Sequence, residues 1–207
     1  MSSSLHLYLL HIADTRALVG SRDESLLKVM RQHFADDLDR DNEHYAHEIG
    51  QGAPTAETAL HAVVHGGPFS ENRQHTFQYG HAYERLCSFI GEFLPNDCFT
   101  PHRGDWLSVV DQELGALGVT AATLEALSEG GPPAPLPYTS TPSCGEWTSG
   151  SIAQALAQYE ATTRRGTMPA DRTPTQEPEV VKAVTQCLDW MRRANAFSGF
   201  GVIGFRS

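Results

Sequence analysis

Hydrophobic positions in the middle of the chain follow the spacing of two α-helices. Apolar side chains recur there at steps of three and four, the spacing of one helix face. The first stripe is Tyr79, Tyr83, Leu86, Ile90 and Phe93, and the second is Trp106, Val109, Val110, Leu114 and Leu117. Leu94-Pro95-Asn96-Asp97 favours a turn, and Thr100-Pro101 is typical of a new helix start. We expect a helical hairpin within residues 79–117, its two stripes facing each other in the core.

The two ends of the chain have the pattern of strands. Leu5, Leu7 and Leu9 alternate with polar or aromatic neighbours, a period of two with one buried face. Residues 199–205 form a short apolar run rich in glycine. Because neither strand is stable alone, we expect them to pair in a small sheet. The predicted fold class is α+β and predominantly helical, with the helices packed on the sheet that joins the N- and C-terminal strands.

Further helices are predicted on either side of the hairpin. A capping box at Ser21–Glu24 precedes an apolar face that runs from Leu26 to Leu38. The other predicted helices are 55–64, 120–127, 151–159 and 178–191. Two proline-containing loops, 130–150 and 164–177, separate the last three. We expect one domain over residues 1–207, the size of an ordinary single domain.

Charge narrows the classes of partner. The formal net charge of −10 argues against a nucleic-acid surface and against anionic membranes. The acidic residues are densest between Gly20 and Leu60, where nine stand against four basic ones. No run approaches the roughly 18 apolar residues of a membrane span, and no basic start precedes an apolar run as in a signal peptide. We do not expect the four widely spaced cysteines to form a disulfide framework, and we expect a cytoplasmic protein.

Histidine is the residue type that best suits a metal site. His61 and His65 are four positions apart on a predicted helix, and His44 and His47 lie just upstream with Glu48. Zinc and iron sites contain such pairs. No spacing fixes a third ligand, however, and no nucleotide-binding or nucleophile motif occurs. We therefore favour surface or partly buried histidines, with these four as weak metal candidates, and expect no cofactor.

Arg103, Asp105 and Trp106 form the sharpest cluster of polar and aromatic residues. One interpretation is a binding site, in which the arginine and aspartate beside an indole hold a ligand or a peptide. The other is structural: Arg103 pairs with Asp97 or Glu92 and locks the hairpin, while Trp106 enters the core. The second interpretation is favoured.

One run of residues resembles a known family. Its pieces are Tyr79-Gly80, Leu86-Cys87, Gly91-Glu92-Phe93-Leu94, Phe99-Thr100-Pro101 and Arg103-Gly104-Asp105-Trp106. The run is similar to a family of uncharacterised bacterial proteins, common in high-GC soil bacteria, that is known only as a domain of unknown function. The likeness extends to Leu7-Tyr8-Leu9, Val19-Gly20-Ser21, Pro135-Leu136-Pro137 and the last strand. It departs from the family at His81 and around residues 164–177. The resemblance implies one soluble cytoplasmic α+β domain, and it supplies no catalytic residues.

Three functions remain open. The first is an acidic protein-binding module, of immunity or regulatory type, that covers a basic partner with Asp36, Asp37, Asp39, Asp41 and Glu43. The second is a metal- or small-molecule-dependent enzyme that uses His44, His47, His61 and His65. The third is a subunit of a larger assembly, with residues 130–150 as its contact. We rank binding first and catalysis last, and the sequence does not indicate an oligomeric state.

Overall fold

A computed structural model describes residues 2–165 and 177–207, so most of the loop predicted at 164–177 lies outside the described residues. The chain divides into two compact units, unit 1 (Met1–Ile12, Glu92–Gly130 and Cys144–Ser207) and unit 2 (Ala13–Gly91 and Gly131–Ser143). Each unit is assembled from segments that are separate in the sequence. That the whole chain folds as one domain stays a prediction.

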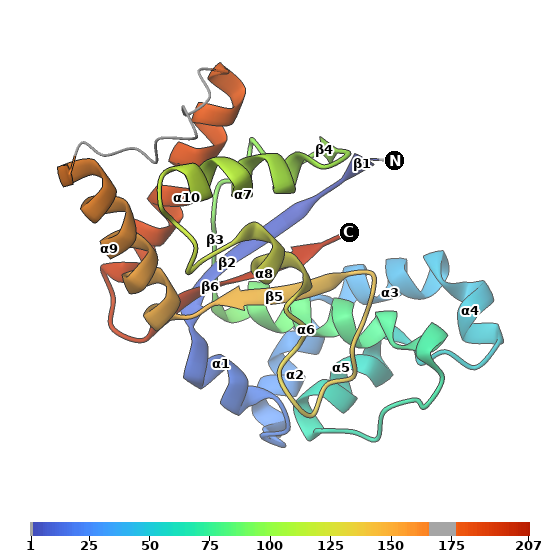
Figure 1. The fold of residues 1–207 in the computed structure, drawn as a ribbon. Helices are drawn as coiled ribbons and strands as arrows, with labels where there is room; N and C mark the ends of the chain where they lie inside the picture. The colour runs from blue at the N-terminus through green and yellow to red at the C-terminus, as the bar shows by residue number, and fades with distance from the viewer. Residues whose placement is uncertain (1, 166–176) are drawn as a thin grey trace. The chain divides into compact units, whose positions relative to one another are not determined.

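A four-stranded sheet in the order β3-β2-β6-β5 organises unit 1 (Figure 1). β2 (Leu5–His11) pairs antiparallel with β6 (Phe200–Arg206), with Leu7 opposite Gly204. The predicted pairing of the terminal strands is therefore confirmed. β3 (Glu92–Phe93) and β5 (Ser143–Trp147) form the two edges, while β1 (Ser2–Ser3) and β4 (His102–Arg103) make a separate two-stranded sheet.

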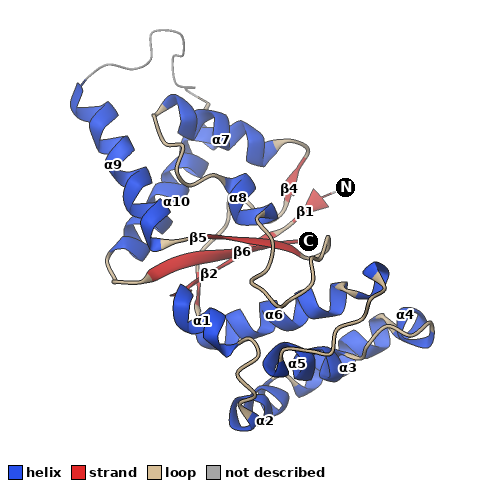
Figure 2. Ribbon diagram, turned by 60° about the horizontal axis from the view of Figure 1, so that its bottom comes forward, coloured by secondary structure: helices blue, strands red, loops and turns tan. Residues whose placement is uncertain are grey.

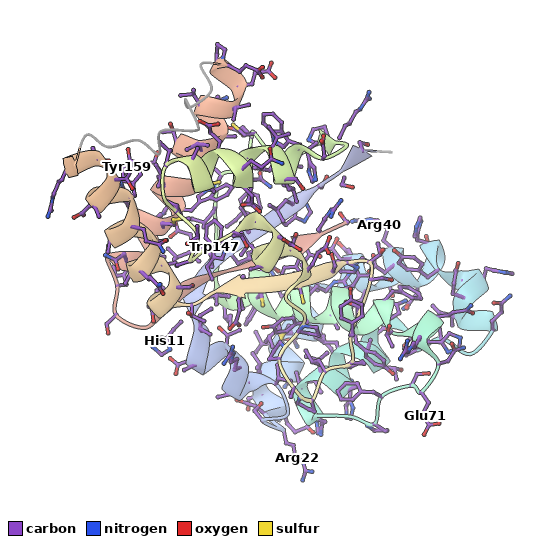
Figure 3. All side chains as sticks on the ribbon, viewed as in Figure 1. His11, Arg22, Arg40, Glu71, Trp147 and Tyr159 are labelled. Atoms are coloured by element: carbon purple, nitrogen blue, oxygen red, sulfur yellow. The ribbon has the colours of Figure 1, made fainter. Side chains whose placement is uncertain are left out.

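Four helices of unit 1 gather on one side of this sheet (Figures 1 and 2). They are α7 (Trp106–Ala116), α8 (Leu124–Glu129), α9 (Ser149–Arg165) and α10 (Pro178–Asn195). α10 contacts α7, α9 and β6. Phe99, Trp147 and Trp190 form an aromatic cluster in the core, with the rings of Phe99 and Trp190 5.1 Å apart (Trp147 is labelled in Figure 3). The α+β fold class, helices packed on a small sheet, is thus confirmed.

Two glycines let α8 lie directly on the strands. A Cβ added to Gly204 in β6 would lie 2.7 Å from the carbonyl oxygen of Leu127, and one added to Gly145 in β5 would overlap the carbonyl oxygen of Ala126. Contacts this close exclude a side chain because backbone atoms cannot move aside as a flexible side chain can. Gly204 of the last strand and Gly145 of β5 therefore serve the packing of α8 on the sheet.

Unit 2 is helical in its described residues. It contains α1 (Ile12–Leu18, whose first residue belongs to unit 1), α2 (Glu24–His33), α3 (Ala35–His44), α4 (Ala46–Gly50), α5 (Ala56–His65), a 3-10 turn (Arg73–His75) and α6 (Phe77–Ile90). α5 packs against α2, α3 and α6. The helix predicted over residues 55–64 is confirmed as α5, and Thr55 is its N-cap, because its side chain accepts a hydrogen bond from the Thr58 amide.

Two expectations about the first helices are corrected. The helix predicted through Leu38 is broken at Phe34, which lies between α2 and α3 in a non-helical conformation. The N-cap of α2 is Asp23 rather than Ser21, since the Asp23 carboxylate accepts from the Ser25 and Leu26 amides. A carboxylate at this position also complements the positive end of the helix dipole.

The predicted hairpin of residues 79–117 is wrong. Its first helix, α6, belongs to unit 2 and packs on α5, whereas α7 belongs to unit 1 and packs on α8 and α10. Tyr83 and Leu86 are buried as expected, but Ile90 and Phe93 are exposed. Helical spacing identifies which face of a helix is buried, but it does not identify the element on which that face packs. Here each apolar stripe packs on helices of its own unit.

Other boundaries move because hydrogen bonds outside the helices compete. α7 begins at Trp106 rather than at Pro101, since residues 102–103 pair with β1 instead. α8 begins at Leu124 rather than at residue 120, because Thr123 is its N-cap and accepts a hydrogen bond from the Ala126 amide. The loop predicted at 130–150 contains β5. Pro178 opens α10 as predicted.

Candidate functional site

A cavity of about 450 Å³ lies in unit 1 between α10 and the segment of residues 94–106, here called the anchored segment. Its lining combines four charged residues with a thiol, an imidazole, a proline and an indole: Asp97, Arg103, Glu179, Lys182, Cys98, His102, Pro101 and Trp106. This volume lies within the range of small-molecule sites. The residues come from two distant parts of the sequence.

The anchored segment is held in place by the pairing of β4 with β1 and by side-chain hydrogen bonds. The indole Nε1 of Trp190 donates to the Pro95 carbonyl, and that of Trp106 donates to the Cys98 carbonyl, each at 2.8 Å. The Cys98 amide donates to Gln186 Oε1 at 3.2 Å. Partly buried hydrogen bonds of this kind favour one conformation of the wall, because breaking them leaves polar groups without a partner.

His102 is buried in the anchored segment and contacts its backbone. Its Nδ1 lies 2.8 Å from the Phe99 carbonyl oxygen, which can only accept, so Nδ1 carries the hydrogen. Its Nε2 is buried and has no hydrogen-bond partner among the described residues. The imidazole therefore stiffens the anchored segment, and its covered Nε2 is not open to the cavity.

Charges of both signs line the cavity without neutralising each other. No ion pair among the described residues includes Arg103, Lys182, Asp97 or Glu179. All four side chains are exposed, so each keeps its hydration. The cavity thus offers two cations and two carboxylates that remain available to a ligand.

Cys98 is the nucleophile nearest to these charges, but its surroundings disfavour the thiolate. Burial raises the pKa of the Cys98 thiol, and Asp97 and Glu179 act in the same direction against the opposing effect of Lys182. The thiolate is the reactive form of cysteine. This arrangement therefore suits binding better than covalent catalysis.

The structure separates the predicted Arg103, Asp105 and Trp106 cluster. Arg103 and Trp106 line the cavity, whereas Asp105 does not. The expected structural lock is wrong in its partner: Glu92 pairs with Arg193 of α10 and not with Arg103. Trp106 is partly exposed rather than fully in the core. The presence of Arg103 and Trp106 in the cavity lining is compatible with the binding interpretation, whereas the sequence analysis favoured the structural interpretation.

A second cavity of about 510 Å³ adjoins the first along α10. The two share Lys182, and the second is lined by Leu94, Pro95, Thr185, Gln186, Asp189, Trp190 and Arg193. The face of α10 that borders the anchored segment is therefore hollowed over several turns.

The acidic residues predicted to bind a partner are on α3 in unit 2, and they divide into two sets. Asp36, Asp39 and Glu43 are exposed and follow a spacing that keeps them on one side of the helix. Asp41 is instead ion-paired with Arg85 of α6, and Asp37 pairs with Arg40. We call the first three residues the acidic face.

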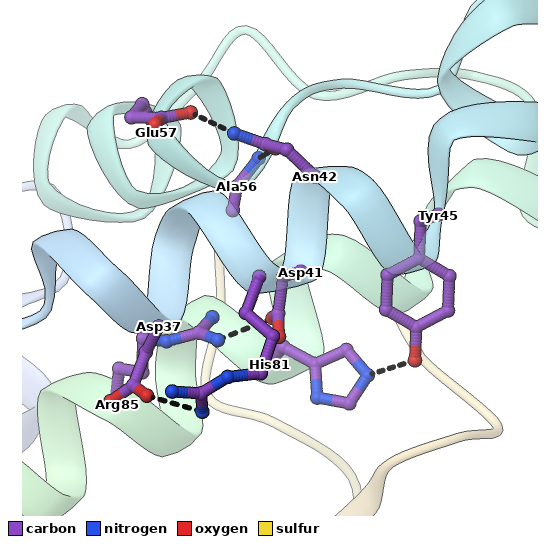
Figure 4. A network of polar contacts seen from close by, with 9 residues as sticks. Asp37, Asp41, Asn42, Tyr45, Ala56, Glu57, His81 and Arg85 are labelled. Carbon is purple, nitrogen blue, oxygen red and sulfur yellow. Dashed lines mark hydrogen bonds and ion pairs between the residues drawn. The ribbon is translucent and has the colours of Figure 1, made fainter.

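A polar network fastens α3 to its neighbours (Figure 4). Asn42 accepts from the Ala56 amide and donates to Glu57, while the Tyr45 hydroxyl lies 3.1 Å from His81 Nε2. Burial lowers the pKa of His81 against the opposing influence of Glu84 and Asp41, which favours the neutral ring in this contact with the Tyr45 hydroxyl. The acidic face is consequently presented on a helix whose opposite side is fixed.

The four histidines proposed for a metal do not converge. His61 and His65 stack face to face with ring centroids 4.0 Å apart, and His65 Nε2 lies 2.9 Å from Glu24 Oε1. His47 contacts Gln51, and His44 packs against the Tyr45 ring. Within residues 2–165 and 177–207, no group of three or more metal-ligating side chains comes together.

The fold and these sites define an acidic α+β protein with a charged cavity in one unit and a carboxylate-bearing helix in the other. The chain belongs to the family described as a domain of unknown function (DUF7691), whose model matches residues 1–207. No curated protein and no solved structure matches it. None of the described helices is long and apolar enough to cross a membrane.

Sequence reasoning did not identify Cys98, His102, Glu179 or Lys182 as parts of a site. His102 is adjacent in sequence to Arg103, and Cys98 is five positions before it. Glu179 and Lys182 lie far from these residues in the sequence, on α10. Only tertiary packing brings α10 to the anchored segment.

Proposed function

We propose that this protein is a non-catalytic, acidic protein-binding module that recognises a basic partner through the acidic face of α3. The observation that carries the proposal is the exposure of Asp36, Asp39 and Glu43 on one side of a helix. Complementary charge accelerates association and sets specificity for a basic surface. The net charge of −10 disfavours nucleic acid as the partner.

The fixed placement of α3 supports this role. Asp41, Asn42 and Tyr45 bind the other elements of unit 2, so the helix that carries the three exposed carboxylates is already in place when a partner arrives. A pre-organised surface loses less entropy on binding than a mobile one. The cytoplasm is the proposed setting, since all four cysteines are free thiols.

The test compares two variants of equal net charge. The first neutralises the acidic face by Asp36→Asn, Asp39→Asn and Glu43→Gln. The second carries Glu125→Gln, Glu129→Gln and Glu160→Gln, three exposed positions of unit 1. Each immobilised protein is exposed to native bacterial lysate, and the retained proteins are identified by mass spectrometry.

The proposal predicts a basic protein retained by the wild type and by the second variant but lost from the first. Raising salt from about 50 to about 500 mM should release it, because exposed charge pairs are screened over a few ångströms at high salt. Equal retention by all three proteins, or retention that salt does not change, would overturn it.

A further inference from the structure

We infer that the cavity between the anchored segment and α10 binds a small zwitterion with an apolar body, of the α-amino-acid class. The cavity belongs to unit 1, so the inference is independent of the acidic face in unit 2. Its basis is the combination of an aromatic wall with charges of both signs, none of which forms an ion pair with another described residue.

The charged groups match the two ends of such a ligand. Arg103 presents a guanidinium, whose planar array of N–H donors suits a carboxylate, and Lys182 adds a second cation. Asp97 and Glu179 accept hydrogen bonds from an ammonium group. A simple anion would be repelled by the two carboxylates and a simple cation by the two basic groups, so a ligand carrying both charges is favoured.

The indole of Trp106 supplies the apolar surface. Its Nε1 already donates to the Cys98 carbonyl at 2.8 Å, so the ring offers its hydrocarbon atoms to a ligand and no hydrogen bond. Apolar and aromatic side chains gain from such a contact. The volume of about 450 Å³ admits a single amino acid.

The ligand is held rather than transformed in this interpretation. Burial keeps Cys98 in its neutral thiol form, and the covered Nε2 of His102 is out of reach. The hydrogen bonds of the anchored segment fix the wall before the ligand arrives. We therefore expect recognition without turnover.

The experiment titrates the full-length protein with three related probes, followed by calorimetry and by tryptophan fluorescence. L-phenylalanine carries both charges, N-acetyl-L-phenylalanine lacks the ammonium, and L-phenylalaninamide lacks the carboxylate. The corresponding three forms of leucine test the contribution of the ring. L-phenylalanine or L-leucine should bind at least about tenfold more tightly than its own two analogues, since each lost charge-assisted hydrogen bond costs about 1.5 kcal/mol or more.

Variants assign the two ends. Arg103→Gln should remove the preference for L-phenylalanine over its amide, and Glu179→Gln should reduce the preference over the N-acetyl form. Arg192→Gln and Glu160→Gln are the charge-matched controls, because both residues are exposed and neither lines the cavity. They should bind all probes as the wild type does, and circular dichroism confirms that each variant is folded.

Several results would overturn the inference. Absence of binding by both free amino acids up to about 10 mM, a free energy of about −3 kcal/mol, is one. Equal affinity for the charged and blocked probes is another, since it would leave no role for the four charges. Unchanged selectivity in Arg103→Gln and Glu179→Gln would place the binding elsewhere.

Discussion

Arg85 of α6 donates a hydrogen bond to the carboxylate of Asp41 on α3, and the two side chains are only 14% and 23% exposed. This ion pair joins helices whose sequences are separated by α4 and α5. Because of this ion pair, Asp41 is not part of the acidic face, although it lies in the same run of charged residues as Asp39 and Glu43. The first prediction follows from this contact.

Asp41→Ala should destabilise the protein by about 3 kcal/mol, because it leaves a largely buried guanidinium without its counter-ion. Asp39→Ala, on the exposed side of the same helix, should change stability by less than about 0.5 kcal/mol. Urea unfolding measures both. The combined Asp41→Leu and Arg85→Met variant should recover part of the loss, and an equally small effect of Asp41→Ala and Asp39→Ala would contradict this account.

His81 predicts a pH dependence of stability. Burial depresses its pKa in the folded state, so the unfolded state binds the proton more readily. The contribution of neutral His81 to the free energy of unfolding is therefore complete above its unfolded-state pKa of about 6.5. It is lost as the pH falls from there towards the pKa of His81 in the folded state. The free energy of unfolding, measured by urea titration between neutral and mildly acidic pH, should fall less steeply in His81→Gln than in the wild type. Identical slopes would show that His81 does not titrate with folding.

Gly204 and Gly115 give a matched pair of glycine-to-alanine substitutions in unit 1. Gly204→Ala places a methyl group 2.7 Å from the Leu127 carbonyl oxygen and should cost about 2 kcal/mol or more. Gly115→Ala in α7 meets no atom within 4 Å and should stabilise the helix by up to about 1 kcal/mol. Thermal unfolding should thus shift in opposite directions. A stable Gly204→Ala protein would mean that α8 does not rest on β6.

Asp111 predicts the last effect on stability. Its two carboxylate oxygens accept from the amides of Leu124 and Glu125, at 2.7 and 3.0 Å, so this residue of α7 caps the first turn of α8. Asp111→Ala should cost about 1 to 2 kcal/mol in urea unfolding, the usual loss of a helix cap. Gln112→Ala in the same helix is the control, because the Gln112 side chain is exposed. A loss no larger than that of Gln112→Ala would show that water replaces the cap.

The sequence by itself determined the local structure that rests on short-range physics. Alternation of Leu5, Leu7 and Leu9 predicted β2, and Pro178 and Thr55 predicted the starts of α10 and α5. These features depend on side-chain spacing and on backbone restrictions a few residues away. The pairing of the two terminal strands was also predictable, since neither is stable alone.

Tertiary structure alone decided the partners of each helix face and the membership of each site. Apolar spacing marked α6 and α7 as half-buried, but a stripe of this kind packs on any complementary surface, and the chain placed the two helices in different units. The same indeterminacy applies to charge: nothing local distinguishes Asp41, which is paired with Arg85, from Asp39, which is exposed. Lys182 and Glu179 lie beside the anchored segment because α10 packs in the same unit. Contacts between residues so distant in sequence depend on the packing of the whole core.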